Sequence, residues 1–161
     1  MKDKDGWTPF SYAVRMGHVE IVKLLLMQED VDINSKDKDE RTPFSYAAAG
    51  WNVEIVELLL VREDVDVNSK DKDGRTPVSY AVGRGNVKII ELLLAREDVG
   101  INSKDKNERT PFSYARWDVA IVELLLVREE FDIDSKDENE QTPFSYAAKE
   151  GNVEIIQLLL A

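Results

Sequence analysis

The chain has no cysteine and only one histidine, His18, among its 161 residues. Disulfide bonds and thiolate chemistry are therefore excluded, and a zinc site lacks its usual ligands. No apolar run approaches the roughly 20 residues that a membrane-spanning helix needs, and the first residues lack the apolar segment of a signal peptide. We expect a protein without a cofactor or a membrane segment, in an intracellular and specifically cytoplasmic setting.

Positive charge is also scarce, because 21 lysines and arginines face 32 aspartates and glutamates, giving a net charge of −11. A field of this sign repels phosphate, so nucleic acid is not an expected partner. Gly83-Arg84-Gly85 follows no predicted strand and does not resemble a phosphate-binding loop. The carboxylates recur along the chain without forming one distinctive pair, and His18 has no triad partner in sequence. Neither an enzyme nor a small-molecule substrate is expected.

One segment imitates a calcium site. Residues 30–34 alternate Asp, Val, Asp, Ile and Asn, as at the start of an EF-hand loop. Ser35 stands where the loop needs glycine, and Arg41 stands where it needs glutamate. The ligand set is incomplete, so no metal site is expected here.

The dominant feature of the sequence is an internal repeat. The motif Thr-Pro-Phe-Ser-Tyr-Ala, with one Val for Phe, recurs at intervals of 34, 34, 34 and 32 residues. Its copies begin at Thr8, Thr42, Thr76, Thr110 and Thr142. A leucine-rich block follows each copy, at 19–26, 53–60, 87–94, 119–126 and 153–160. Each unit predicts two short helices, and stacking of the units would give one continuous core.

The helix boundaries are signalled by capping residues. Thr followed by Pro predicts a helix start, so the first helix should run over about residues 9–16. Glycine suits a left-handed turn after the first helix, and Asn or Asp suits the cap of the second. These positions are Gly17, Gly85 and Gly151 for the turns, and Asn86, Asp118 and Asn152 for the caps. We expect the second helix to bury Ile21, Val22, Leu24, Leu25 and their counterparts.

These motifs resemble those of the ankyrin repeat family, in the variety found in arrays of large fungal proteins. The family's Thr-Pro-Leu-His-x-Ala appears as Thr-Pro-Phe-Ser-Tyr-Ala, and the Gly-Asn-x-Glu-Ile-Val-x-Leu-Leu-Leu half is nearly intact. The resemblance implies an all-α solenoid of five helix-turn-helix repeats joined by β-turn fingers. We expect a single domain over 1–161, with repeats at about 2–35, 36–69, 70–103, 104–135 and 136–161. Serine replaces the signature histidine, and the period is one residue longer than usual.

Positions that differ between the repeats are candidates for function. They cluster at the ends of the first helices and just before each Thr, which in ankyrin proteins line a concave, partner-binding face. The predicted contact residues are Trp7, Arg15, Met16, Arg41, Trp51, Arg75, Arg84, Arg109, Arg116 and Trp117. Trp and Arg are common anchors of protein interfaces. This face is neutral to mildly basic and the opposite side acidic, so a partner with aromatic or acidic groups fits it. For each Trp the alternative is packing on a neighbouring repeat.

Two positions depart from the pattern. Trp51 stands where other repeats have glycine, so either Gly50 takes over the left-handed turn or the backbone shifts. The fourth repeat lacks two residues before Asp118, which predicts a shortened first helix and a reorganised turn.

The leading hypothesis is a non-catalytic module that binds a partner protein through the concave face. It is either a natural segment of a longer array or a binder selected on such a scaffold. The absence of polar capping repeats leads us to expect a segment that was cut or built. A structural spacer or a self-associating stack is the alternative, since uncapped ends favour end-to-end pairing of an otherwise monomeric chain. A domain that delivers a substrate to an enzyme elsewhere is a third hypothesis.

Overall fold

The computed structural model describes residues 2–116 and 118–161, so the predicted contact residue Trp117 lies outside the described residues. Within the described ranges the regular structure is entirely helical. In chain order the helices are α1 (Pro9–Met16), α2 (Val19–Leu26), α3 (Pro43–Ala49), α4 (Val53–Leu60), α5 (Pro77–Arg84), α6 (Val87–Leu94), the 3-10 helix η1 (Pro111–Tyr114), α7 (Val119–Leu126), α8 (Pro143–Glu150) and α9 (Val153–Leu160). None of these is long and apolar enough to cross a membrane.

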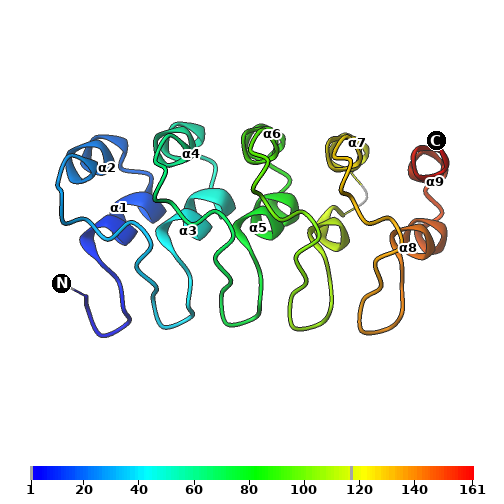
Figure 1. Cartoon of the computed structure of the whole chain (residues 1–161), viewed down its shortest axis with the longest axis horizontal. Coiled ribbons are helices and arrows are strands. Elements are labelled where there is room, and N and C mark those ends of the chain that lie inside the picture. The colour runs from blue at the N-terminus through cyan, green and yellow to red at the C-terminus, as the bar shows by residue number, and fades with distance from the viewer. Residues whose placement is uncertain (1, 117) are drawn as a thin grey trace.

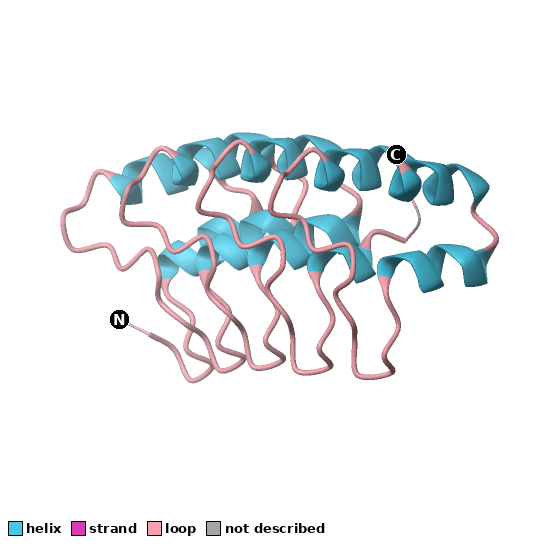
Figure 2. Ribbon diagram, turned by 45° about the vertical axis from the view of Figure 1, so that its right-hand side comes forward, coloured by secondary structure: helices cyan, strands magenta, loops and turns pink. Residues whose placement is uncertain are grey.

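The helices form two rows along one axis, with a row of projecting loops beside the first (Figure 1). The first row holds α1, α3, α5, η1 and α8, and the second holds α2, α4, α6, α7 and α9. Each projecting loop, or finger, precedes a first-row helix and lies beside the next finger along the axis (Figure 2). We call the surface made by the fingers and the first row the inner face. This arrangement confirms an all-α repeat solenoid.

Local sequence signals explain where the helices begin. The side chains of Thr8, Thr42 and Thr142 each accept a hydrogen bond from the backbone N–H of the serine three residues later. Asn86, Asp118 and Asn152 cap the second-row helices in the same way, as predicted. Gly17, Gly85 and Gly151 adopt left-handed φ values of 75°, 76° and 69°, so the predicted turns after the first helices are also confirmed.

The core runs between the two rows, and its residues recur with the repeat. Ile89, Ile90 and Leu93 of α6 have no exposed surface. We expected α2 to bury Ile21, Val22, Leu24 and Leu25. For Ile21 and Leu24 this expectation was wrong, because their side chains are 48% and 63% exposed. In later repeats the equivalents of Ile21, which are Ile55, Ile89, Ile121 and Ile155, are buried because another helix pair stands before theirs, whereas α1 and α2 are the first pair of the described residues.

Polar side chains tie each repeat to the next. Lys36 and Lys70 each donate a hydrogen bond from Nζ to the backbone carbonyl of the equivalent lysine one repeat later, at 3.0 and 2.8 Å. Asn68 donates to the Asp98 carbonyl at 2.6 Å and accepts from the Gly100 N–H at 2.8 Å. These bonds join neighbouring loops at every step, so the stack does not depend on apolar packing alone.

The two irregular positions, Trp51 and the deletion in the fourth repeat, differ in how the backbone accommodates them. Helix α3 ends one residue early, and Gly50 is extended, with φ −89° and ψ −166°. The backbone has therefore shifted, and no residue there takes the left-handed turn. In the fourth repeat the first helix is reduced to the four residues of η1, and Arg116 adopts a left-handed φ of 49°. The predicted shortening is confirmed.

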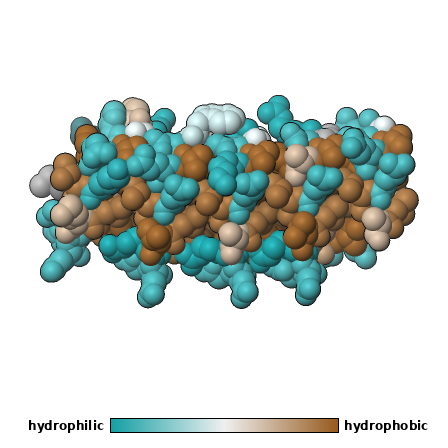
Figure 3. Space-filling model, turned by 90° about the horizontal axis from the view of Figure 1, so that it is seen from above, coloured by the Kyte–Doolittle hydropathy of each residue, from teal (hydrophilic) through white to brown (hydrophobic). Residues whose placement is uncertain are grey.

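The second-row side of the molecule is not uniformly polar. Seen from that side, apolar side chains form bands that are separated by hydrophilic ones (Figure 3). Among the exposed apolar residues, Met27, Val61 and Val127 follow the ends of α2, α4 and α7 and are 78%, 79% and 78% exposed. Exposed apolar surface is thus not confined to the inner face, and exposure alone does not mark a binding site.

Candidate functional site

Each finger is organised by an aspartate, which is buried in every finger except the first. The Oδ1 atom of Asp71 accepts hydrogen bonds from the backbone N–H groups of Asp73 and Arg75, both at 2.9 Å. Its Oδ2 atom accepts from the Tyr80 hydroxyl at the start of α5. The same Asp–Tyr bond occurs in the other repeats, as Asp3–Tyr12, Asp37–Tyr46, Asp105–Tyr114 and Asp137–Tyr146. It fixes each finger to the helix that follows.

The Asp–Tyr pairs were not foreseen from the sequence. Their signal is nevertheless visible, because the aspartate and the tyrosine keep a separation of nine residues in every pair. The two-residue deletion in the fourth repeat leaves this spacing intact, since it falls after Tyr114.

Within the pairs the pKa of each tyrosine is raised, and the pKa of three of the aspartates, Asp3, Asp105 and Asp137, is lowered. Burial and the hydrogen bond donated to Asp71 raise the pKa of Tyr80 to about 12. Burial alone would raise the pKa of Asp105, but hydrogen bonds from Tyr114 and from the Arg109 and Asn107 N–H groups outweigh it and lower that pKa. At neutral pH Tyr80 is therefore protonated and donates, and Asp105 is ionised.

These shifts predict how stability depends on pH. The contribution of a carboxyl whose folded pKa is lowered is complete above about pH 4 and is lost as pH falls through the folded value. The contribution of Tyr80, whose pKa is raised, is complete below about pH 10 and is lost as pH rises through about 12. Urea midpoints measured in high salt, which screens the net charge, should show a plateau between these limits. A midpoint that climbs from pH 5 to pH 3 would contradict this.

Four of the six predicted arginines, Arg15, Arg41, Arg75 and Arg109, lie over aromatic rings of the inner face. The guanidinium carbon of Arg41 is 5.0 Å from the centre of the Tyr80 ring, and that of Arg75 is 5.4 Å from the centre of the Tyr114 ring. Arg109 also lies over Tyr114, at 5.2 Å. Such stacking holds a flat guanidinium in place while leaving part of it accessible. The tyrosines of the first-row helices therefore hold these finger arginines in place.

Trp7 does not lie where a contact residue should. Only 8% of it is exposed, and its ring packs 4.6 Å from the Tyr46 ring and 5.0 Å from the Tyr12 ring. The Arg15 guanidinium covers it at 4.9 Å. Trp7 thus fits the packing alternative, with Tyr46 of the following repeat as its neighbour. It supports the inner face from below.

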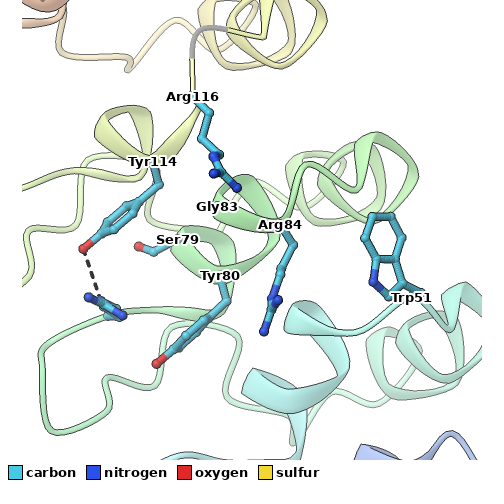
Figure 4. Close-up of a pocket in the computed structure, with 8 residues that line it drawn as sticks. Trp51, Ser79, Tyr80, Gly83, Arg84, Tyr114 and Arg116 are labelled. Atoms are coloured by element: carbon cyan, nitrogen blue, oxygen red, sulfur yellow. Dashed lines mark hydrogen bonds between the residues drawn. The ribbon is translucent and has the colours of Figure 1, made fainter.

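Trp51 lies on the surface, at the edge of a hollow between α3, α5 and η1. Its side chain is 69% exposed. The hollow measures about 490 Å³ and is lined by Trp51, Arg75, Ser79, Tyr80, Gly83, Arg84, Tyr114 and Arg116. In Figure 4 Arg116 extends from the η1 side toward Gly83, while Arg84 and Trp51 stand on the opposite side. Four predicted contact residues therefore meet in one place, which we call the arginine hollow.

The other predicted residues that the structure describes lie elsewhere on the inner face. A second hollow, of about 340 Å³, contains Trp7, Arg15 and Arg41 together with Asp5, Asp37, Lys38, Asp39 and Tyr46. Met16 is 61% exposed at the end of α1. The sequence did not distinguish the two hollows.

The repeat motifs and the helix pairs agree with a comparison to known families. A family model described as ankyrin repeats in three copies matches residues 1–71 and 44–137, and an ankyrin repeat model matches residues 139–161. The chain belongs to the ankyrin repeat family. No curated protein matches it. Ankyrin repeats generally mediate interactions between proteins and are typically non-catalytic.

The acidic segment that imitates a calcium loop takes part in this ankyrin packing instead. Ile33 is 3% exposed, and Asn34 donates a hydrogen bond to the Asp64 carbonyl of the next repeat at 2.7 Å. Among the described residues no cluster of histidine and carboxylate side chains is arranged to hold a metal ion. The segment's polar side chains serve the contact between ankyrin repeats.

Gly83 lies inside α5 and forms part of the floor of the arginine hollow. A Cβ atom added there would meet Tyr114 Cβ at 3.6 Å and Cδ1 at 3.9 Å, which is ordinary contact. Gly83→Ala should therefore raise the free energy of unfolding by about 0.5–1 kcal/mol, since glycine weakens a helix interior. Urea denaturation measures this, with Gly85→Ala as control. Gly85 has a φ of 76°, so its substitution should destabilise. A change of the same sign in the free energy of unfolding of both variants would contradict this prediction.

Proposed function

We propose that this chain is a non-catalytic module that binds a partner protein through its inner face, the concave face of ankyrin proteins. Each finger with its following helix pair forms one repeat, giving five in all. The observation that carries the proposal is the exposure of Trp51 beside the arginine hollow. A large aromatic side chain that is 69% exposed and flanked by arginines has the composition of an interface anchor.

The contact residues fall into two groups by their accessibility. Arg15, Met16, Trp51, Arg84 and Arg116 are exposed and would touch the partner directly. Arg41, Arg75 and Arg109 are partly buried on the tyrosines and would offer one edge of the guanidinium. Trp117 is proposed as a contact from its sequence position, and Trp7 acts indirectly, through Arg15.

The proposal is tested by capture from a cell lysate with the intact chain and with Trp51→Ala. We expect a partner retained by the intact chain to be lost from the variant, because removing an anchor costs at least about 2 kcal/mol of binding free energy. Val61→Ala is the matched control, since Val61 is 79% exposed and lies at the other end of α4. Circular dichroism checks that both variants fold.

The outcomes are distinct. Partner lost with Trp51→Ala and kept with Val61→Ala supports binding through the inner face. Equal retention by both variants would move the site to another surface. Loss with Val61→Ala alone would place it on the second-row side, among the apolar bands of Figure 3.

A further inference from the structure

The arginine hollow differs in charge from its surroundings. It is lined by three arginines, and none of its lining residues is an aspartate or glutamate, in a chain whose net charge is −11. The nearest finger carboxylates, Asp71 and Asp105, are buried and accept hydrogen bonds from Tyr80 and Tyr114. The second hollow, by contrast, contains three aspartates beside its cations. Only the first of these two hollows is free of carboxylates along its lining.

The arginines of this hollow have N–H groups that make no bond to an anionic partner among the described residues. Arg75 donates from Nε to the Tyr114 hydroxyl at 3.2 Å, which is a neutral partner. Arg84 and Arg116 are exposed, and neither makes an ion pair within the described part of the chain. Most other arginines of the chain are engaged, as Arg62 is with Asp64 at 2.9 Å. Guanidinium groups without an anionic partner favour binding of a carboxylate, often by two parallel hydrogen bonds.

The irregularity of the fourth repeat contributes to the hollow. Its first helix is reduced to η1, and Arg116 follows directly in a left-handed conformation. On the facing helix Gly83 has no side chain to occupy the space. Figure 4 shows Tyr114 and Arg116 on one side of this space and Arg84 on the other. The deletion and the glycine together leave room for a ligand group where a regular repeat would place helix.

We propose that the arginine hollow binds an acidic segment of the partner polypeptide. An Asp or Glu carboxylate is taken up by Arg84 and Arg116, and a neighbouring apolar or aromatic side chain packs against Trp51. This inference rests on the proposed function and specifies the chemistry of the partner. An extended polyanion fits less well, because the overall field of a chain with net charge −11 repels it.

The test is selection of short random peptides displayed on phage, using the folded full chain as bait. We expect the wild type to enrich peptides with Asp or Glu next to an apolar or aromatic residue. The double variant Arg84→Gln/Arg116→Gln should lose the acidic preference, and Trp51→Ala should lose the apolar one. The matched control is Arg62→Gln/Lys88→Gln, which removes two exposed cations of the second-row side and should select as the wild type does.

Affinity measurements make the test quantitative. The best wild-type peptide, titrated by fluorescence anisotropy, should bind at least about tenfold more weakly when its acid is changed to the amide, because hydrogen bonds to a charged group are stronger than those to a neutral one. Binding should also weaken as salt is raised. Single-stranded oligothymidylate serves as the polyanion probe and should bind more weakly than the peptide.

Three results would overturn the inference: peptides without an acidic preference, no enriched peptide at all, or tighter binding of the oligonucleotide. In the first two, loss of the captured partner on Trp51→Ala would still leave the proposed function standing. Unchanged capture by Trp51→Ala would instead count against the proposed function itself, whatever the peptides show.

Discussion

Replacing Asp71 by alanine should lower the free energy of unfolding by about 3 kcal/mol or more, because three donors lose a buried acceptor at about 1–3 kcal/mol each. Those donors are the backbone N–H groups of Asp73 and Arg75 and the hydroxyl of Tyr80. Asp71 is 5% exposed, so water does not readily replace it. Urea denaturation followed by circular dichroism measures the change.

Asp3 supplies the matched control for this prediction. It accepts the equivalent bonds from the Asp5 and Trp7 N–H groups and from the Tyr12 hydroxyl, at 2.9, 2.8 and 2.7 Å. Asp3 is exposed, however, so water can satisfy the same donors after Asp3→Ala. We expect the Asp3 variant to be affected far less than the Asp71 variant. Similar losses at both positions would mean that burial is not what makes the finger aspartate important.

Replacing Ile89 by alanine should cost about 3–4 kcal/mol, because a fully buried isoleucine loses its packing and leaves a cavity. Ile89 has no exposed surface and lies in α6, at the middle of the stack. In a solenoid each repeat is stabilised by its neighbours, so damage at the middle weakens the coupling between the two halves. The unfolding transition should therefore broaden as well as shift, which a urea titration detects directly.

The equivalent residue Ile21 provides the comparison. It occupies the same position of α2 but is 48% exposed, and no helix pair precedes it. Ile21→Ala should cost well under half as much as Ile89→Ala and should leave the steepness of the transition unchanged. A cost at Ile21 equal to that at Ile89 would show that packing within one repeat dominates over packing between repeats.

The helices were predictable because their signals are local. Thr8 and Pro9 mark the start of α1 within two residues, and Gly17 ends it through a conformation that glycine adopts readily. Because the same motif recurs along the chain, the helix boundaries of one repeat could be predicted in the other repeats. The family resemblance followed from the same motifs, and the family comparison confirmed it.

What the sequence could not supply depends on contacts between repeats. Trp7 is buried because Tyr46 of the next repeat packs against its ring, and the sequence around Trp7 does not indicate this contact. Ile21 matches the buried positions of later repeats and is exposed only because of its place in the stack. The arginine hollow likewise combines residues of three repeats, so inspection of any one motif could not reveal it.

The lysine bonds between loops have a mechanical consequence. Lys36, Lys70 and Lys104 each reach one repeat onward, and none spans two, so the links lie one after another along the axis. A molecule pulled by its two ends would therefore transmit the whole force across each boundary between repeats in turn, where one lysine bond shares the load with the packed core. It would lengthen in separate steps as single links open. The first step should come beside η1, where the shortened helix leaves the least structure to resist.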